Sequence, residues 1–332
     1  MVSDCSFLGD KGGLRETETE AEMTVPDISL IICTHNPRTE YLSRVLGALR
    51  AQTLPLGQWE LLVIDNASTQ PLDQILDLSW HPSGRVVREE ETGLTPARLR
   101  GIAESKGELL IFVDDDNVLD ADYLSVAAEL AKTLPQIGAF GGSIRAEFEV
   151  PPPSWIDSYI EGFAVCELDR DYWSNFGGWS LASPYGAGLC ARREVARDYS
   201  AKVKNSPLRR MLDRTGTGMG AGGDSDLAWC ASDAGMGTGR FCKLKMTHLI
   251  PKNRLTEDYI IRVYAGFAAS GVALEAIRPG PSKSRVSKWV NRARELWKSL
   301  RSSGIQRRIN AAASKARRKA EQQLAAMMSS AK

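Results

Sequence analysis

The sequence predicts an α/β fold in which a mostly parallel sheet carries helices on both faces. Short apolar runs with the length of buried strands alternate with segments whose apolar residues recur every three or four positions. This alternation is typical of sheets in which a helix connects each strand to the next. After residue 280 the pattern becomes helical and strongly basic, which indicates a separate C-terminal tail.

Four apolar runs are the expected strands, at residues 28–33, 59–64, 86–88 and 108–113. Helices are expected around Leu42–Leu49, over 96–106 and over 224–234, the last after a glycine-dense loop. Residues 141–184 interrupt this order with glycines, prolines and aromatic side chains. A long irregular segment inside a domain is commonly functional or mobile.

The chain divides into three parts. Residues 1–26 are polar and lack any period, so we expect a disordered leader. Residues 27–277 form the α/β domain. The sequence Arg-Pro-Gly-Pro at 278–281 is a plausible boundary, and residues 278–332 form the basic amphipathic tail.

Composition indicates an ordinary soluble protein, with 43% hydrophobic and 25% charged residues. No continuous run reaches the roughly 18 apolar residues of a membrane span, and the first residues lack the order of a secretory signal. We therefore expect a cytoplasmic enzyme. The six cysteines form no CxxC pair, so neither a zinc site nor a disulfide framework is expected.

The tail from Pro281 to Lys332 holds 14 Lys and Arg against two Glu, while the rest of the chain has a net charge of −11. Val286, Trp289 and Trp297 recur there at helical spacing. Such a helix suits an anionic membrane surface and would place the enzyme on the inner face of the membrane. Packing on its own domain or on a partner is the alternative. Nucleic acid is a less expected ligand.

Polar triplets follow three of the expected strands: Thr-His-Asn at 34–36, Asp-Asn-Ala at 65–67 and Asp-Asp-Asp at 114–116. In parallel sheets, ligands bind beyond the carboxyl ends of the strands. Adjacent carboxylates at the end of a buried strand repel one another, and Mg²⁺ or Mn²⁺ would relieve that repulsion. A solvated acidic turn is the alternative for Asp114, Asp115 and Asp116. For Asp65 the alternatives are contact with the imide of a uracil-like base and an Asx turn.

Five segments resemble, in order, those of family 2 glycosyltransferases: ISLIICTHNP, WELLVIDNAS, GLTPARLRGIAESKGELLIFVDDDN, YGAGLCARREVA and GGDSDLAW. The resemblance covers roughly residues 27–265. It implies a GT-A fold with a Rossmann-like sheet. It also implies metal-dependent, inverting transfer of a sugar from a UDP, GDP or dTDP donor to a saccharide or lipid-linked acceptor. Polysaccharide or glycolipid assembly would be the setting.

The resemblance also implies roles for individual residues. Thr34, His35 and Asn36 match the first nucleotide-contacting loop, and Asp65 matches the residue that reads the base. Gly93 and Arg98 fall in the segment that lines the pyrophosphate and ribose.

Asp114 and Asp116 match the outer members of the family's DXD motif, with Asp114 and Asp115 on the nucleotide-sugar side and Asp116 as a metal ligand. His248 is expected to be a further metal or pyrophosphate contact, and a structural role is its alternative. Asp224 matches the catalytic base, although Gly223 stands where the family usually has Glu, and Asp226 is a weaker neighbour. The alternative for Asp224 is a helix N-cap, with Asp226 in the first turn.

Other residues have less defined roles. Arg254 could neutralise phosphate, and Trp155, Trp173 and Trp179 could stack on sugar rings or simply pack. Two other functional classes are considered. A nucleotidylyltransferase would need a Gly-rich phosphate loop after the first strand, which is missing. A non-catalytic membrane- or nucleic-acid-binding protein would be expected to lose acidic positions that this chain keeps.

Overall fold

A computed structural model describes residues 26–213, 220–278 and 304–330. Within these ranges a nine-stranded sheet has the strand order β3-β2-β1-β4-β8-β6-β9-β5, and β7 pairs with β9. The strands are β1 (Ile28–Thr34), β2 (Trp59–Asn66), β3 (Gly84–Glu89), β4 (Leu109–Val113), β5 (Asn117–Leu119), β6 (Ile137–Phe148), β7 (Tyr172–Ser174), β8 (Leu189–Arg192) and β9 (Gly237–Ile250).

The α-helices are α1 (Thr39–Arg50), α2 (Leu94–Glu104), α3 (Tyr123–Thr133), α4 (Arg193–Lys204), α5 (Pro207–Arg210), α6 (Gly223–Asp233), α7 (Glu257–Ile277) and α9 (Gly304–Ser330). Short 3-10 helices are η1 (Leu56–Gln58), η2 (Leu72–Gln74), η3 (Ser154–Phe163) and η4 (Lys252–Arg254). The expected strands and helices are therefore present, with ends shifted by a few residues.

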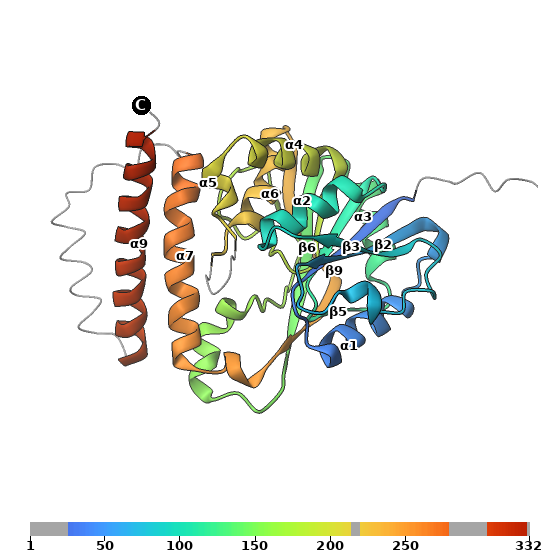
Figure 1. The fold of residues 1–332 in the computed structure, drawn as a ribbon, viewed down its shortest axis with the longest axis horizontal. Helices are drawn as coiled ribbons and strands as arrows, with labels where there is room; N and C mark the ends of the chain where they lie inside the picture. The colour runs from blue at the N-terminus through green and yellow to red at the C-terminus, as the bar shows by residue number, and fades with distance from the viewer. Residues whose placement is uncertain (1–25, 214–219, 279–303, 331–332) are drawn as a thin grey trace, which may run out of the picture.

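The first half of the sheet is parallel, as predicted. β1 pairs in parallel with β2 and β4, and β2 with β3. Successive side chains of a strand point to opposite faces, so a strand covered on both faces is apolar throughout. In β1, Ile28, Leu30 and Ile32 pack with α1 and α3, whereas Ile31 packs with α2, α4 and α6 on the other face. Figure 1 shows this arrangement of helices around the sheet.

The second half of the sheet is mixed. β8 pairs antiparallel with β4 and β6, and β5 and β7 pair antiparallel with β9, while β6 and β9 are parallel. The irregular stretch 141–184 contributes the end of β6, η3 and β7. This half brings residues from beyond position 180 to the edge where the first strands end.

Helix α7 extends away from the sheet and lies beside α9 (Figure 1). A small third core joins η3, the end of β9, α7 and α9, and Ile309 is its buried residue from α9. Arg308 forms ion pairs with Glu257 and Asp258, and Arg317 pairs with Glu275. The part of the basic tail that the structure describes therefore packs on the chain's own domain. The tryptophan-bearing segment 286–300 lies outside the described residues, as does the leader up to residue 25.

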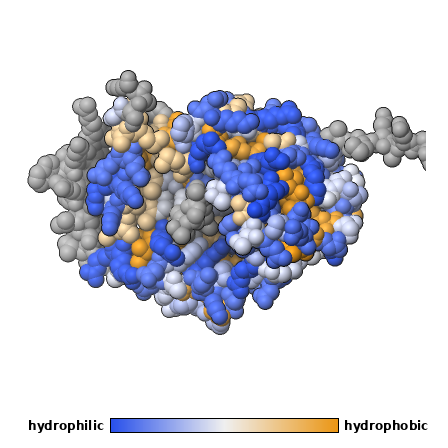
Figure 2. Space-filling model, viewed as in Figure 1, coloured by the Kyte–Doolittle hydropathy of each residue, from blue (hydrophilic) through white to orange (hydrophobic). Residues whose placement is uncertain are grey.

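An 18-residue window of α7 has a mean hydropathy of 1.5, and by length and composition alone this 21-residue helix could cross a membrane. The expectation that no segment qualifies was therefore wrong, because it considered only unbroken apolar runs. Glu257, Asp258, Arg262 and Glu275 divide α7 into shorter apolar runs. Figure 2 shows apolar surface along α7 beside the hydrophilic surface of α9.

The packing of α9 gives a stability prediction. Ile309 is 2% exposed, so Ile309→Ala should leave a cavity between α9 and α7 and lower the free energy of unfolding by about 2–4 kcal/mol. Urea unfolding at equilibrium measures this change. Ile75→Ala is the control, because Ile75 is 49% exposed. Equal effects of the two substitutions would show that α9 does not pack on α7 as described.

Candidate active site

The carboxyl ends of β1, β2 and β4 meet at one edge of the sheet. Thr34 lies opposite Asp65 in the β1–β2 register, and Ile32 lies opposite Val113 in the β1–β4 register. The hydroxyl of Thr34 donates a hydrogen bond to the Asp115 carboxylate. The polar triplets that follow the three strands are thus brought together, as the parallel arrangement predicts.

The first loop is tied to the second by short polar contacts. Asn36, whose φ is 49°, accepts a hydrogen bond from the Thr69 amide at 2.8 Å, and its own amide donates to the Ser68 hydroxyl at 2.9 Å. His35 is exposed, and its Nδ1 lies 2.7 Å from the Asn66 carbonyl oxygen. The nucleotide contacts of these residues remain a prediction, but hydrogen bonds join the two loops into one rim.

Asp116 is the buried member of the acidic triplet, 6% exposed. Its Oδ2 lies 3.0 Å from Arg254 Nη1 and 3.4 Å from His248 Nε2. Burial raises the pKa of Asp116, but His248 and Arg254 outweigh it and lower that pKa to about 2. Asp116 is therefore a carboxylate held charged by cationic and imidazole partners.

The β5–β9 ladder brings these partners together. Asn117 lies opposite His248 in the antiparallel register, and the Leu249 amide donates to the Asp116 carbonyl at 2.9 Å. Helix η4, which follows β9, places Arg254 beside both Asp116 and His248. This pairing joins residues more than 100 positions apart in the chain.

His248 has the orientation of a metal-ligating imidazole. Its Nδ1 lies 2.8 Å from the Phe163 carbonyl oxygen, which can only accept, so Nδ1 carries a proton. A charged ring therefore donates from Nε2 to Asp116 Oδ2, 3.4 Å away, whereas in a neutral ring Nε2 carries a lone pair that a cation could bind. A carbonyl that fixes the tautomer in this way is the usual support of a histidine ligand. Arg254 Nη1, 3.1 Å from His248 Nε2, places a positive charge where a cation would contact both side chains.

Asp114 and Asp115 are half-buried beside Asp116. Burial, followed by the charge of Asp116, raises the pKa of Asp115 to about 6. Three charged carboxylates are thus unfavourable together at this edge, which fits a cluster that receives a divalent cation.

Asp65 lies at the predicted strand end but points into the protein. It is 1% exposed and accepts hydrogen bonds from the Ser68 amide at 3.0 Å, the Leu72 amide at 3.0 Å and Arg88 Nη1 at 2.7 Å. Burial raises the pKa of Asp65, but these hydrogen bonds outweigh it and lower that pKa. This arrangement is the turn-stabilising alternative, and base recognition by Asp65 remains a prediction.

Gly93 is the N-cap of α2 and has a φ of 139°, a conformation that favours glycine. Its amide donates to the side-chain oxygen of Asn66 at 2.7 Å, and the Asn66 amide group donates to the Glu91 carbonyl at 2.6 Å. Asn66 was not among the residues predicted for the site. Its place directly after Asp65 in a strand-ending turn is the signal that could have found it.

Arg98 is buried on α2, and its Nη1 donates to Asp213 Oδ2 at 2.9 Å. Burial lowers the pKa of Arg98, but the carboxylates of Asp213 and Asp224 outweigh it and raise that pKa. Asp213 is a buried acid that the sequence did not single out. Arg98 therefore lies among acidic side chains, and its predicted contact with pyrophosphate is untested.

Asp224 stands in the first turn of α6 and is half-buried. Its Oδ2 accepts a hydrogen bond from the Gly186 amide at 2.9 Å, and its Oδ1 accepts from the Ser225 amide at 2.8 Å. Gly222 is the N-cap of α6, so Asp224 is not the capping residue. Its charge is nevertheless favoured by the helix dipole. Asp226 is fully buried and contacts Arg209 Nη1 at 2.5 Å, which makes it a structural ion pair.

The comparisons with known proteins decide the family. The model of the family described as Glycosyl transferase family 2 matches residues 29–198, just over half of the chain. The chain belongs to glycosyl transferase family 2. This membership sets aside the nucleotidylyltransferase alternative.

Relatives of this family 2 chain match it in part. Glycosyltransferase AglE of Haloferax volcanii is 32% identical over 96 residues, 28% of this chain and 31% of that protein. The glucosyl-dolichyl phosphate glucuronosyltransferase of the same organism is 21% identical over 172 residues, 51% of this chain and 53% of that protein. The chain thus spans less than two thirds of the length of these relatives.

The fold is shared with a solved structure, mannosyltransferase PcManGT from Pyrobaculum calidifontis in complex with GDP-Man and Mn²⁺. Its TM-score is 0.53 at 20% identity, covering 93% of this chain and 81% of that one. The expected GT-A fold is confirmed.

The tryptophans of the irregular segment differ in their surroundings. Trp155 is half-buried and contacts Tyr159 in the third core, which is the packing alternative. Trp173 and Trp179 are exposed, and Trp179 meets Trp229 edge to face at 5.2 Å. Stacking on a sugar remains a prediction for these two.

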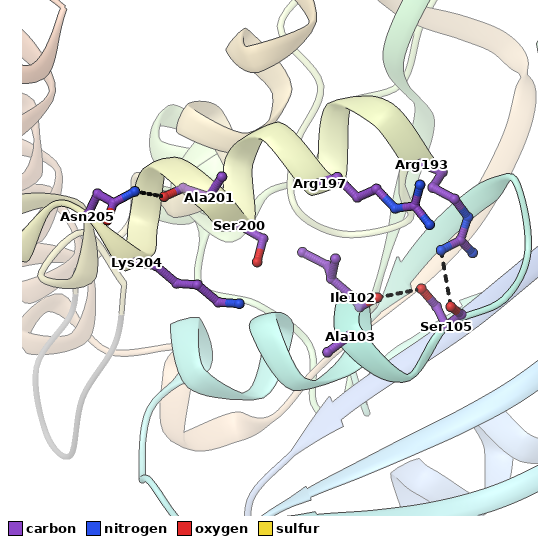
Figure 3. A pocket seen from close by; sticks show the side chains of 9 residues that line it. All are labelled: Ile102, Ala103, Ser105, Arg193, Arg197, Ser200, Ala201, Lys204 and Asn205. Atoms are coloured by element: carbon purple, nitrogen blue, oxygen red, sulfur yellow. Dashed lines mark hydrogen bonds between the residues drawn. The ribbon is translucent and has the colours of Figure 1, made fainter.

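Two other features of the family 2 chain lie apart from the strand-end site. A hollow of about 490 Å³ between α2 and α4 is lined by basic and small side chains, and no candidate site residue lines it (Figure 3). Arg193 there donates to the Ser105 carbonyl at 3.1 Å, a structural contact. Asp198, Cys230 and Asp233 lie close enough to hold a metal, but Lys202 Nζ already contacts both carboxylates, at 2.5 and 2.6 Å. We assign no metal to that group.

Proposed function

We propose that this family 2 chain transfers a sugar from a nucleotide-sugar donor to a hydroxyl acceptor, in a metal-dependent reaction that inverts the anomeric configuration. The observation that carries the proposal is the strand-end site. It combines an Asp116–His248 pair oriented as ligands with the Asp224 carboxylate at the start of α6.

The roles follow from the charges that develop during transfer. The departing diphosphate gains negative charge, and the acceptor hydroxyl must lose a proton as it attacks. Asp116 and His248 would hold Mn²⁺ or Mg²⁺, which acts as a Lewis acid on the diphosphate. Asp224 takes the acceptor proton as general base. Its two backbone hydrogen bonds fix the carboxylate in one orientation.

The donor is proposed as a nucleoside diphosphate sugar of the UDP, GDP or dTDP type. The complex of PcManGT with GDP-Man and Mn²⁺ supports both a nucleotide sugar and a divalent cation. In this proposal the rim formed by residues 34–36 and 65–69 faces the nucleoside, and Asp114 and Asp115 face the sugar nucleotide.

The acceptor is proposed as a saccharide or a lipid-linked saccharide, in polysaccharide or glycolipid assembly. The similarity to the glucosyl-dolichyl phosphate glucuronosyltransferase of Haloferax volcanii supports a lipid-linked acceptor. We place the enzyme in the cytoplasm, at the inner face of the membrane.

A thermal-shift screen tests the function. UDP-, GDP- and dTDP-sugars are each added with Mn²⁺, with Mg²⁺ or with EDTA. At least one donor should raise the unfolding temperature in the presence of metal and lose that effect in EDTA. A chain that responds to no donor of the panel would instead support the alternative of a non-catalytic binding protein.

Gly186 tests the placement of the base. A Cβ at this position would lie 2.9 Å from Asp224 Oδ2 and 3.1 Å from Arg98 Nη2. Gly186→Ala should therefore displace the Asp224 carboxylate and lower the turnover of the responding donor by about 10- to 100-fold. Gly47→Ala is the matched control, because nothing lies within 4 Å of a Cβ there. Equal turnover of the two variants would contradict this placement.

Membrane binding is tested on α9. Lys315, Arg318 and Lys319 are exposed on the basic helix beside the apolar surface of α7. At about 1 kcal/mol for each basic residue, changing all three to Gln should weaken co-sedimentation with phosphatidylserine vesicles by about 100-fold.

The control carries the same loss of charge on the α/β domain, as Lys132→Gln, Lys243→Gln and Lys245→Gln, three exposed positions. The control protein should bind the vesicles as the wild type does. If the α9 variant and the control bind equally well, α9 does not form the membrane surface.

A further inference from the structure

Asp213 is a buried acid that no part of the proposed mechanism uses. Its side chain is 4% exposed and lies just after α5. The carboxylate accepts hydrogen bonds from the Thr95 hydroxyl at 2.9 Å, from Arg98 Nη1 at 2.9 Å and from the Gly223 amide at 3.1 Å. One carboxylate thus joins the start of α2 to the start of α6.

The contact with α6 requires a glycine. A Cβ at position 223 would lie 2.2 Å from Asp213 Oδ2 and 2.4 Å from its carboxyl carbon, closer than atoms can approach. The amide of Gly223 belongs to the first turn of α6, where backbone donors have no partner within the helix. Asp213 supplies that partner and places a negative charge at the helix N-terminus, where the dipole favours it.

Arg98 links Asp213 to the proposed base, Asp224. A Cβ built at Gly186 would have Asp224 Oδ2 at 2.9 Å and Arg98 Nη2 at 3.1 Å, so both groups border the same small space. Arg98 is buried, and the charge of Asp224 contributes to raising the pKa of Arg98. Asp213 accepts a hydrogen bond from Nη1 of the same guanidinium, and this pairing offsets the cost of burying the Arg98 charge.

We propose that Asp213 is the positioning residue of the base Asp224. It fixes the N-terminal turn of α6 through Gly223 and fixes Arg98 beside the Asp224 carboxylate. A carboxylate is needed in the space between Thr95, Arg98 and Gly223, and here it comes from the end of α5 rather than from position 223. This inference rests on the proposed role of Asp224.

A carboxylate swap tests the proposal. Asp213→Asn keeps an oxygen for the Gly223 amide but removes the charge that faces Arg98. Asp213→Ala removes the carboxylate from this space. Adding Gly223→Asp to the same protein places a carboxylate there again, now from α6. Asp213→Ala with Gly223→Asn is the matched control, with the same shape and no charge.

UDP-GlcNAc and GDP-mannose are first tested with the wild-type protein in Mn²⁺, and the donor that it hydrolyses is used. The measurements are kcat and KM for release of nucleoside diphosphate from that donor. Asp213→Asn should lower kcat by about 10- to 100-fold and change KM much less, because misplacement of a base affects the chemical step. The variant with the returned carboxylate should have about 10-fold higher kcat than its Asn control. Urea unfolding midpoints are measured for every variant.

Two results would overturn the positioning role: wild-type kcat in Asp213→Asn, or equal kcat in the two double variants while Asp213→Asn is folded. Asp224→Asn is assayed alongside. If Asp224→Asn is inactive and Asp213→Asn is fully active, the proposed base stands and the inference fails. If Asp224→Asn keeps its turnover, the base assignment fails and the inference falls with it.

Discussion

Asp224→Asn should lower turnover by about 100- to 10,000-fold, the range expected for loss of a general base. The amide oxygen can still accept the hydrogen bond that Gly186 donates at 2.9 Å, so this contact should persist while the bond from the Ser225 amide is lost. Asn cannot take the proton of the acceptor hydroxyl. The effect should therefore appear in kcat, measured by release of nucleoside diphosphate, while donor binding stays close to that of wild type.

Asp226 provides the contrast two positions along α6. It is fully buried and paired with Arg209, and Arg278 Nε lies 3.5 Å from it. Asp226→Asn should lower the free energy of unfolding by about 3–5 kcal/mol, because it leaves buried positive charge uncompensated. If Asp224→Asn instead lowered stability and kept normal turnover, the two acids would have exchanged their assigned roles.

Asp116→Asn should abolish metal-dependent donor binding. The substitution removes the charge that Arg254 and His248 now face at 3.0 and 3.4 Å. An amide is a poor ligand for Mn²⁺ or Mg²⁺ compared with a carboxylate. Loss of Lewis-acid stabilisation of the diphosphate, worth several kcal/mol, should lower kcat/KM by about 100- to 1,000-fold.

Titration calorimetry with the responding donor, in Mn²⁺ and in EDTA, measures this effect. In wild type the metal should strengthen binding, and in Asp116→Asn the two titrations should coincide. Asp122→Asn is the control, because Asp122 is exposed and its side chain does not cap the helix that it precedes. Metal-dependent binding that survives in Asp116→Asn would place the metal elsewhere.

The sequence predicted the parallel half of the fold and the edge where the site lies. Strands buried on both faces are apolar throughout, so β1, β2 and β4 stand out, and their polar ends must meet. The helix expected at 224–234 is α6, Gly223–Asp233. These features depend on local pattern and on the geometry of parallel strands.

Contacts between distant segments could not be read from the same pattern. The β5–β9 ladder, which sets His248 beside Asp116, depends on an antiparallel register between strands far apart in the chain. The bond from Asp213 to Gly223 depends on how the end of α5 meets α6. The sequence shows only that position 223 is glycine, and the reason is the carboxylate that approaches it.

The inward orientation of Asp65 is a third such case. An Asp at the end of a strand can point toward a ligand or toward its own turn. Its orientation depends on neighbouring side chains such as Arg88 of β3, which donates a hydrogen bond to Asp65. The structure shows the turn contacts. The donor complex will show whether the base also reaches this residue.

The anomeric configuration of the released sugar tests the central claim most directly. Proton NMR follows the wild-type protein with an α-linked nucleotide sugar and Mn²⁺, with water as the acceptor. One base and in-line attack predict that the first sugar to appear is the β-anomer, together with the nucleoside diphosphate. Release of the α-anomer first, or no release from any donor that binds, would contradict the account.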